Sequence, residues 1–178
     1  MSKFDWVMRG RCHKFGDDVP HAGGIVPAHF VTARETDPDV LKPHLFAELR
    51  PGFSEQCRPG DIIVAGQRFG MGPKVPGYIA MRAHGLGLVC ESMPVQAYRA
   101  ALGEGLPVLA PNPGILHLCD DGDMLEVDFS TGVFLNQTRG LRAQLNPVPE
   151  VLRDLVTRGG TAGWLTHWWQ HQRESAAV

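Results

Sequence analysis

An alternation of apolar runs and amphipathic segments between residues 61 and 110 constrains the fold more than any other feature of the sequence. Residues 62–65, 86–90 and 107–110 are short, continuous apolar runs. Runs of this length are typical of strands that are buried on both faces. Each of the two intervals between them has the pattern of a helix. Strands and helices that alternate in this way predict a parallel sheet with right-handed crossovers.

The two helices of this region carry start and stop signals. The first is expected at about residues 76–84, where Gly85 ends it. Ser92 is the expected N-cap of the second, with Pro94 just inside it. Apolar side chains at Val95, Tyr98 and Leu102 then share one helix face.

The chain before residue 61 is predicted to begin with a strand at residues 8–15. A helix is expected over residues 35–49, with Thr36 as a possible N-cap. Three leucines at four-residue spacing support this helix: Leu41, Leu45 and Leu49. Pro43 argues against it, because an interior proline interrupts helical hydrogen bonding.

The chain after residue 110 follows a different pattern. Apolar and polar residues alternate over 125–130, and an apolar run returns at 133–135, which predicts a β-hairpin. A helix is expected from Pro149 to the Gly159-Gly160 pair. A short terminal helix follows with four large apolar residues, Trp164, Leu165, Trp168 and Trp169. Trp168 and Trp169 are expected to pack in the core, with a partner surface or a lid as the alternative.

We therefore expect a single α/β domain spanning residues 1–178, with a mixed, largely parallel sheet plus a β-hairpin. Hydrophobic residues make up 43% of the chain and charged residues 20%, which excludes a disordered tail, a collagen-like repeat and a coiled coil. The net charge of −2 provides no basic footprint for nucleic acid. No segment has the roughly 20 apolar residues of a membrane helix. The N-terminus lacks the pattern of a secretory signal, so the cytoplasm is the expected location.

The cysteines and histidines do not form a recognisable metal site. Cys12, Cys57, Cys90 and Cys119 are scattered, with no C-x-x-C pair, so they are expected to be free and partly buried. The eight histidines contain one pair at helical spacing, His167 and His171, without an H-E-x-x-H motif. No cofactor is therefore expected in this chain.

The loop over residues 66–74 is the strongest candidate site, because it lies between a buried strand and a helix. Ligands of α/β sheets bind at the carboxyl ends of strands, where free N–H groups of a helix N-terminus attract anions. Arg68 and Lys74 add positive charge to the same loop. The pattern would suit a carboxylate or phosphate, although it matches neither the Walker motif nor the dinucleotide fingerprint. The alternative is that Gly70 and Gly72 only form a tight turn.

The sequence resembles the small subunit of 3-isopropylmalate dehydratase, the swivel domain of the aconitase superfamily. The resemblance covers most of residues 10 to 160. It is carried by these segments, in this order: His13-Lys14-Phe15-Gly16-Asp17-Asp18-Val19, Ile25-Val26-Pro27-Ala28-His29-Phe30, Leu41-Lys42-Pro43-His44-Leu45-Phe46, Pro51-Gly52-Phe53, Pro59-Gly60-Asp61-Ile62-Ile63-Val64-Ala65-Gly66, Phe69-Gly70-Met71-Gly72, Glu91-Ser92 through Tyr98-Arg99, and Gly105-Leu106-Pro107-Val108-Leu109.

The resemblance implies a swivelling β/β/α domain and a role in leucine biosynthesis. It also implies an aconitase-like large subunit as the partner, which carries a [4Fe–4S] cluster and helps to remove a hydroxyl group from a small hydroxy-carboxylic acid. The small subunit of that family binds no cluster and supplies substrate contacts and the catalytic serine. His29 and Phe30 match its substrate-recognition loop, and Gly70 and Gly72 match the loop before the catalytic motif.

The catalytic motif itself departs from the family. Family members read Ser-Ser-Arg-Glu where this chain has Pro73, Lys74, Val75 and Pro76. Lys74 stands in place of the serine base, and Val75 in place of an arginine that binds a carboxylate. The family's Asp-Thr-Asp is replaced near His21-Ala22-Gly23, and its Ser-Phe-Ala-Arg reads Ser92-Met93-Pro94-Val95.

Three interpretations follow from this mixture. In the first, the chain is a hydro-lyase subunit in which Lys74 is the catalytic residue, acting as a base or pairing with a carboxylate. His29, Phe30, Arg68, Gly70, Gly72 and Pro73 would then bind the substrate. In the second, the chain is a non-catalytic swivel-like partner or regulatory subunit. In the third, it is a stand-alone anion-binding α/β domain.

Overall fold

The computed structural model describes residues 4–72 and 74–175. A seven-stranded sheet runs through the molecule in the order β4-β3-β2-β1-β5-β6-β7. The strands are β1 Val7–Lys14, β2 Ile62–Ala65, β3 Gly87–Cys90, β4 Val108–Leu109, β5 Met124–Asp128, β6 Val133–Asn136 and β7 Leu141–Gln144. β1 lies at the centre, parallel to β2 on one side and antiparallel to β5 on the other. The sheet is therefore mixed, with a parallel half and an antiparallel half.

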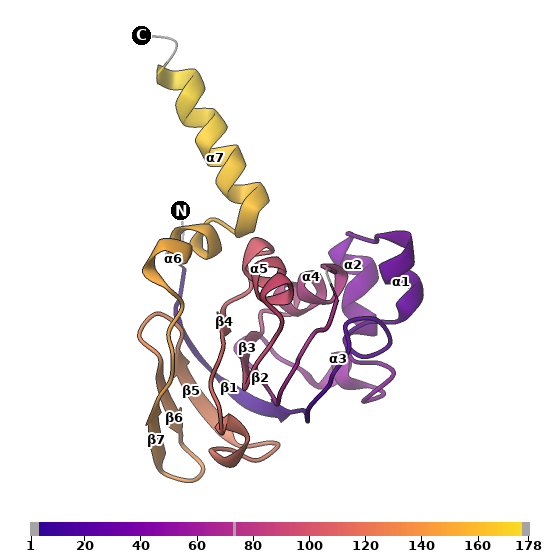
Figure 1. Ribbon diagram of the computed structural model, residues 1–178, viewed down its shortest axis with the longest axis vertical. Coiled ribbons are helices and arrows are strands. Elements are labelled where there is room, and N and C mark those ends of the chain that lie inside the picture. The colour runs from indigo at the N-terminus through magenta and orange to yellow at the C-terminus, as the bar shows by residue number, and fades with distance from the viewer. Residues whose placement is uncertain (1–3, 73, 176–178) are drawn as a thin grey trace.

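The helices gather in groups around this sheet (Figure 1). Their bounds are α1 Ala28–Ala33, α2 Pro38–Leu41, α3 Phe53–Gln56, α4 Pro76–Ala83, α5 Val95–Gly103, α6 Glu150–Thr157 and α7 Gly160–Ser175, with 3-10 turns at Lys42–His44 and Ile115–His117. α1 to α3 lie together beside α4, whereas α7 projects away from the rest of the molecule. None of the helices in the described residues is long and apolar enough to cross a membrane.

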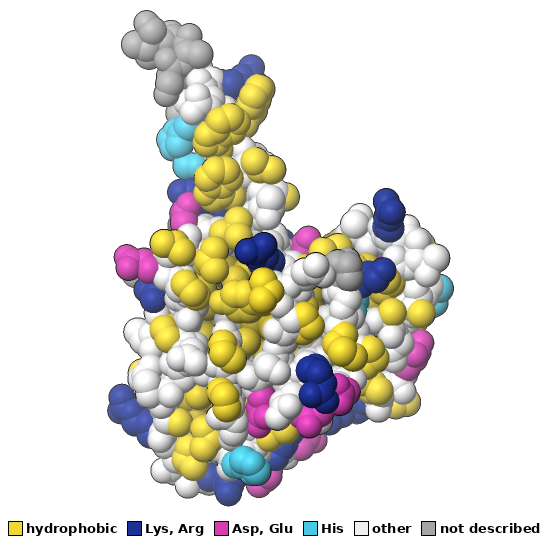
Figure 2. All heavy atoms as spheres, in the orientation of Figure 1, with side chains coloured by type: hydrophobic (Ala, Val, Ile, Leu, Met, Phe, Trp, Pro, Cys, Tyr) yellow, Lys and Arg dark blue, Asp and Glu magenta, His cyan; other side chains and the backbone are white. Residues whose placement is uncertain are grey.

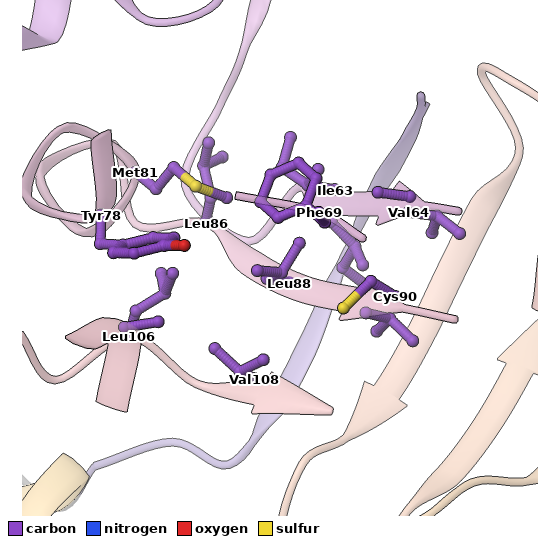
Figure 3. Packing of buried hydrophobic residues seen from close by; sticks show 14 of the residues in the cluster. Ile63, Val64, Phe69, Tyr78, Met81, Leu86, Leu88, Cys90, Leu106 and Val108 are labelled. Carbon is purple, nitrogen blue, oxygen red and sulfur yellow. The ribbon is translucent and has the colours of Figure 1, made fainter. Parts of the chain in front are cut away.

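The parallel half of the sheet forms the centre of the hydrophobic core. Every residue of β2, β3 and β4 is buried, which confirms the prediction from the apolar runs. Figure 3 shows Tyr78 and Met81 of α4 beside Leu88 and Val108 of the sheet. Tyr78 is completely buried although it carries a hydroxyl group. Removing a large apolar side chain from water contributes roughly 1.5–3 kcal/mol, so this layer holds α4 firmly on the sheet.

The predicted helix over residues 35–49 is wrong. The chain forms α2 and then a 3-10 turn that contains Pro43, because proline has no N–H group to continue the helical pattern. The N-cap is Asp37, whose carboxylate accepts the Asp39 N–H at 2.9 Å, and not Thr36. Leu41 and Leu45 are completely buried, whereas Leu49 is 48% exposed, so the three leucines do not form one buried helix face.

The C-terminal third also differs from the expectation. The predicted hairpin forms as β5 and β6, but β7 adds a third antiparallel strand that the sequence did not predict. β7 has no buried residue, and the short alternation of Leu141 and Ala143 with Arg142 and Gln144 is its only sequence signal. The terminal helix is 16 residues long. Trp168 and Trp169 are 45% and 59% exposed, so the prediction that they pack in the core is wrong.

Candidate functional site

The candidate site is built from two loops at the carboxyl edge of the parallel strands. Residues 66–75 follow β2, and residues 15–22 follow β1. Backbone hydrogen bonds join the two loops: the Asp18 N–H donates to the Gln67 carbonyl and the Gly70 N–H to the Val19 carbonyl, both at 2.8 Å. The parallel pairing of β1 with β2 brings these loops together, although 50 residues separate them.

Gly70 and Gly72 are needed for the backbone conformation of the loop, and Gly70 is also needed for its close packing on Tyr78. Gly70 and Gly72 have φ angles of +72° and +107°, which side chains with a Cβ rarely adopt. A Cβ on Gly70 would also collide with the Tyr78 hydroxyl. Gly70 therefore lets the loop lie directly on α4.

The Arg68 side chain joins the two loops through an ion pair, so its charge is already neutralised within the chain. Its guanidinium binds the Asp18 carboxylate through two hydrogen bonds, at 2.5 and 2.6 Å. These bonds hold the pKa of Asp18 below its usual value. The Arg68 N–H donates to the Ser92 hydroxyl at 3.0 Å, so Ser92 does not cap the following helix. The N-cap of α5 is Pro94.

His21 lies beneath the loop and occupies the amino end of α4. Its Nε2 accepts the Gly77 N–H at 2.9 Å, while the Tyr78 N–H donates to the Val75 carbonyl and Pro76 has no N–H. The helix amides that we expected to be free for an anion are therefore used within the chain. Burial, together with the positive charge of Lys74, lowers the pKa of His21 to about 4. His21 is thus neutral at pH 7, as an acceptor must be.

A pocket between α1 and the start of α4 is lined by two positively charged side chains. It has a volume of about 350 Å³ and is lined by Val31, Arg34, Thr36, Lys74, Val75 and Pro76; we call it the Arg34–Lys74 pocket. Among the described residues, no hydrogen bond or ion pair engages the side chain of Arg34 or Lys74. Two unpaired cations that line one cavity favour an anionic ligand.

The structure separates the site residues that the sequence predicted. Lys74 lines the pocket, whereas the His29 ring packs on Phe30 with ring centroids 4.0 Å apart, and Phe30 packs on His44. Neither His29 nor Phe30 is among the residues that line the Arg34–Lys74 pocket. Pro73 lies outside the described residues.

Arg34 is the pocket residue that sequence reasoning missed. It is the C-cap of α1, with a left-handed φ of 54°. It is also the first Lys or Arg after the segment Ile25–Phe30, which resembles the substrate-recognition loop. That signal was present in the sequence, but its significance depends on the distant Lys74.

A second cavity lies next to the site at the carboxyl ends of β3 and β4. It has a volume of about 340 Å³ and a largely apolar lining: Ser92, Met93, Val95, Tyr98, Ala110 and Pro111. Val95, which stands where the resemblance implies an arginine, is part of this lining.

The donor set of this chain does not fit an iron–sulfur cluster. All four cysteines are free and buried, and burial raises the pKa of Cys90 to about 12, which disfavours the thiolate that a cluster requires. Cys57 lies 3.3 Å from His84 Nδ1, and Cys12 lies 3.6 Å from Cys119. No group of three or more metal-binding side chains occurs in the described part of the chain.

Comparisons with known proteins relate this arrangement to one family. No family model matches the chain. The small subunit 2 of 3-isopropylmalate dehydratase from Archaeoglobus fulgidus is 35% identical over 160 residues, which cover 89% of this chain and 94% of that protein. The small subunit of Methanosarcina mazei is 35% identical over 156 residues, 86% of this chain and 93% of its own.

A solved structure agrees with these sequence relatives. The crystal structure of 3-isopropylmalate dehydratase from Methanocaldococcus jannaschii superposes with a TM-score of 0.84 at 28% identity and covers 95% of this chain and 99% of its own. In each comparison, the similarity thus extends over most of the length of this chain and of the protein compared with it. The chain belongs to the family of 3-isopropylmalate dehydratase small subunits.

Proposed function

We propose that this chain is the small subunit of a hydro-lyase that acts on a small hydroxy-carboxylic acid together with an aconitase-like large subunit. The observation that carries the proposal is the Arg34–Lys74 pocket. It provides two unpaired cations at the carboxyl edge of the sheet, within the fold of a family whose names refer to 3-isopropylmalate. A dicarboxylate requires cations at its binding site.

Arg34 replaces the charge that the family's catalytic motif has lost here. Valine at position 75 cannot bind a carboxylate, whereas the planar guanidinium of Arg34 can bind one through two hydrogen bonds. Val31, Val75 and Pro76 form apolar walls around the two cations. This combination supports a substrate with a carboxylate and an apolar branch, as in an isopropylmalate.

We assign the catalytic role to Lys74, which occupies the position of the family's serine base. Its side chain is exposed in the isolated chain, so a partner that covers the pocket would remove water from the ammonium group. Desolvation favours the neutral amine, which accepts the proton from the carbon next to the one that bears the hydroxyl group. The Lewis acidity that assists departure of the hydroxyl group would come from a [4Fe–4S] cluster on the large subunit.

We propose that the whole chain forms one swivel-like domain. Its pocket is lined by residues of the loop between β2 and α4 and of the segment after α1, and its four cysteines are free, buried and scattered along the chain. A large subunit would therefore provide the metal chemistry, and this chain would provide substrate contacts and proton transfer.

Reconstitution with a cluster-bearing large subunit tests these roles. Dehydration of 3-isopropylmalate is measured for the wild type, Lys74→Ala, Arg34→Ala and the control Arg142→Ala, whose side chain is exposed on β7. Loss of a general base lowers kcat by about 100-fold or more. Loss of the guanidinium raises KM by about tenfold or more, because one charged hydrogen bond contributes roughly 1.5–3 kcal/mol. An unchanged rate for Lys74→Ala would exclude it as the base.

A non-catalytic subunit is the second candidate, and the loss of the family's serine and arginine favours it. It would form a complex with the large subunit, and no substrate in the hydroxy-acid class would be turned over. A stand-alone anion binder would form no complex at all. Measuring complex formation separately from turnover therefore distinguishes the three cases.

A further inference from the structure

A row of large apolar side chains lies uncovered on α7. Trp164, Leu165, Trp168 and Trp169 are 38%, 50%, 45% and 59% exposed; we call them the tryptophan stripe. Their spacing of one, three and one residues places all four on one side of an α-helix. This stripe is independent of the candidate active site and of the function proposed for it.

α7 contacts the rest of the molecule through its first turns. Gly160 packs against the backbone of residues 103–105, at the end of α5, and Trp164 lies close enough to Asp154 of α6 to lower the pKa of that carboxyl. Beyond these contacts the helix projects from the body (Figure 1). A lone helix of this length is marginally stable in water, so a partner that covers the stripe would stabilise both the helix and the apolar surface.

The surface of α7 has the composition of an interface between identical subunits. Residues 160–172 contain no Lys, Arg, Asp or Glu. Homodimer interfaces are depleted of charge and enriched in aromatic residues. Because the stripe carries no charge, two copies of it can meet without repulsion. Figure 2 shows that hydrophobic side chains on α7 continue onto the body below its base.

The order of the stripe is symmetric about its own midpoint. If two α7 helices lie antiparallel with a two-fold axis level with the midpoint between residues 166 and 167, Trp164 faces Trp169 of the second copy, and Leu165 faces its Trp168. Thr161 and Gln172, which lie on the same side of the helix, also face each other in this register. A two-fold interface requires a surface that is complementary to itself, and this pattern satisfies that requirement.

We infer that the tryptophan stripe joins two copies of this chain through antiparallel pairing of their α7 helices. A second copy suits the stripe better than the large subunit does. The base of α7 lies at the carboxyl end of α5, whereas the Arg34–Lys74 pocket that the large subunit must cover lies at the amino end of α4. α4 and α5 each run from the carboxyl ends of the parallel strands back to their amino ends. The base of α7 and the pocket therefore lie at opposite ends of these strands.

Sedimentation equilibrium on the full chain tests the pairing. The wild type is expected at twice its 19.5 kDa mass. Leu165→Glu and Trp168→Lys are each expected to weaken the dimer by about 100-fold or more, because each buries a charge without a partner. Val151→Glu on α6 is the matched control, since Val151 is 86% exposed and lies outside the stripe. It is expected to stay dimeric.

Mixing the two single variants tests the register. In the mixed pair, Glu at position 165 of one chain faces Lys at position 168 of the other, while Trp168 and Leu165 meet at the second contact. The mixture is therefore expected to form a heterodimer although each variant alone is monomeric. Circular dichroism verifies that both variants are folded. A monomeric wild type, a dimeric single variant or a monomeric mixture would each overturn the inference.

Discussion

His21 shows at the residue scale how one side chain can hold a candidate active site in place. It accepts the Gly77 N–H and lies in contact with Tyr78, with ring centroids 4.8 Å apart. Since Gly77 follows Lys74 by three residues, His21 also determines where the loop that carries Lys74 meets α4. This role depends on a neutral imidazole, which links it to pH.

We predict that the chain loses stability as the pH falls from 6.5 towards 4. The pKa of His21 is lowered from 6.5 to about 4 in the folded state, so the unfolded chain binds the proton first. The contribution of His21 to the free energy of unfolding is complete above the pKa of the unfolded state, 6.5. It disappears as the pH falls to the pKa of the folded state, about 4. It amounts to about 3 kcal/mol. Urea unfolding at several pH values measures it.

His21→Gln is the matching variant for that titration. Glutamine can accept a hydrogen bond but does not titrate, so most of the loss between pH 6.5 and 4 should disappear. A smaller slope remains, because burial also lowers the pKa of His84. If the slope of the variant equals that of the wild type, His21 does not cause the pH dependence.

At the scale of elements, Asp61, which directly precedes β2, joins that strand to the second half of β1. Its carboxylate accepts the N–H groups of Arg11 and Arg58 at 2.8 and 2.9 Å and lies 2.9 Å from His13 Nε2. Asp61 and His13 are both buried. One carboxylate therefore connects β1, the turn before β2, and the buried histidine.

We expect Asp61→Leu to destabilise the fold by about 3–5 kcal/mol, because it leaves buried donors without an acceptor. Asp61→Asn should lower the free energy of unfolding less, since the amide oxygen can still accept a backbone N–H. Arg9→Ala serves as the exposed control: the Arg9 side chain is 60% exposed and pairs with Glu126 at the surface, and such pairs contribute about 1 kcal/mol or less. Equal losses of stability for Asp61→Leu and Arg9→Ala in urea unfolding would contradict this role of Asp61.

At the scale of the whole molecule, the core and α7 are separable. The buried apolar residues of the core extend from Cys12 to Val156, and none of the side chains described on α7 is among them. Its exposed stripe therefore concerns assembly and not the folding of the body.

Removal of the chain after Gly159 is expected to preserve cooperative unfolding of the body, because the buried apolar core lies before α7. The same truncation is expected to produce a monomer in size-exclusion chromatography with light scattering. A truncated chain that fails to fold would show that α7 belongs to the core in solution.

The sequence by itself determined the parallel half of the fold and the location of the candidate loop. Continuous apolar runs can be satisfied only by burial on both faces, so β2, β3 and β4 were predictable. Proline and glycine marked the limits of α4. The same local signals failed where burial is incomplete, as in β7, or where a proline divides a run of leucines, as at Pro43.

Only the tertiary structure decided which charges are available at the site. Arg68 and Asp18 are 50 residues apart, and their pairing removes a cation that the sequence placed beside Lys74. Arg34 lies 40 positions before Lys74 and yet lines the same pocket. Charge is a property of a single residue, but its availability depends on the neighbours that parallel strand pairing brings close. For that reason the loop could be predicted from the sequence, whereas the chemistry of its pocket could not.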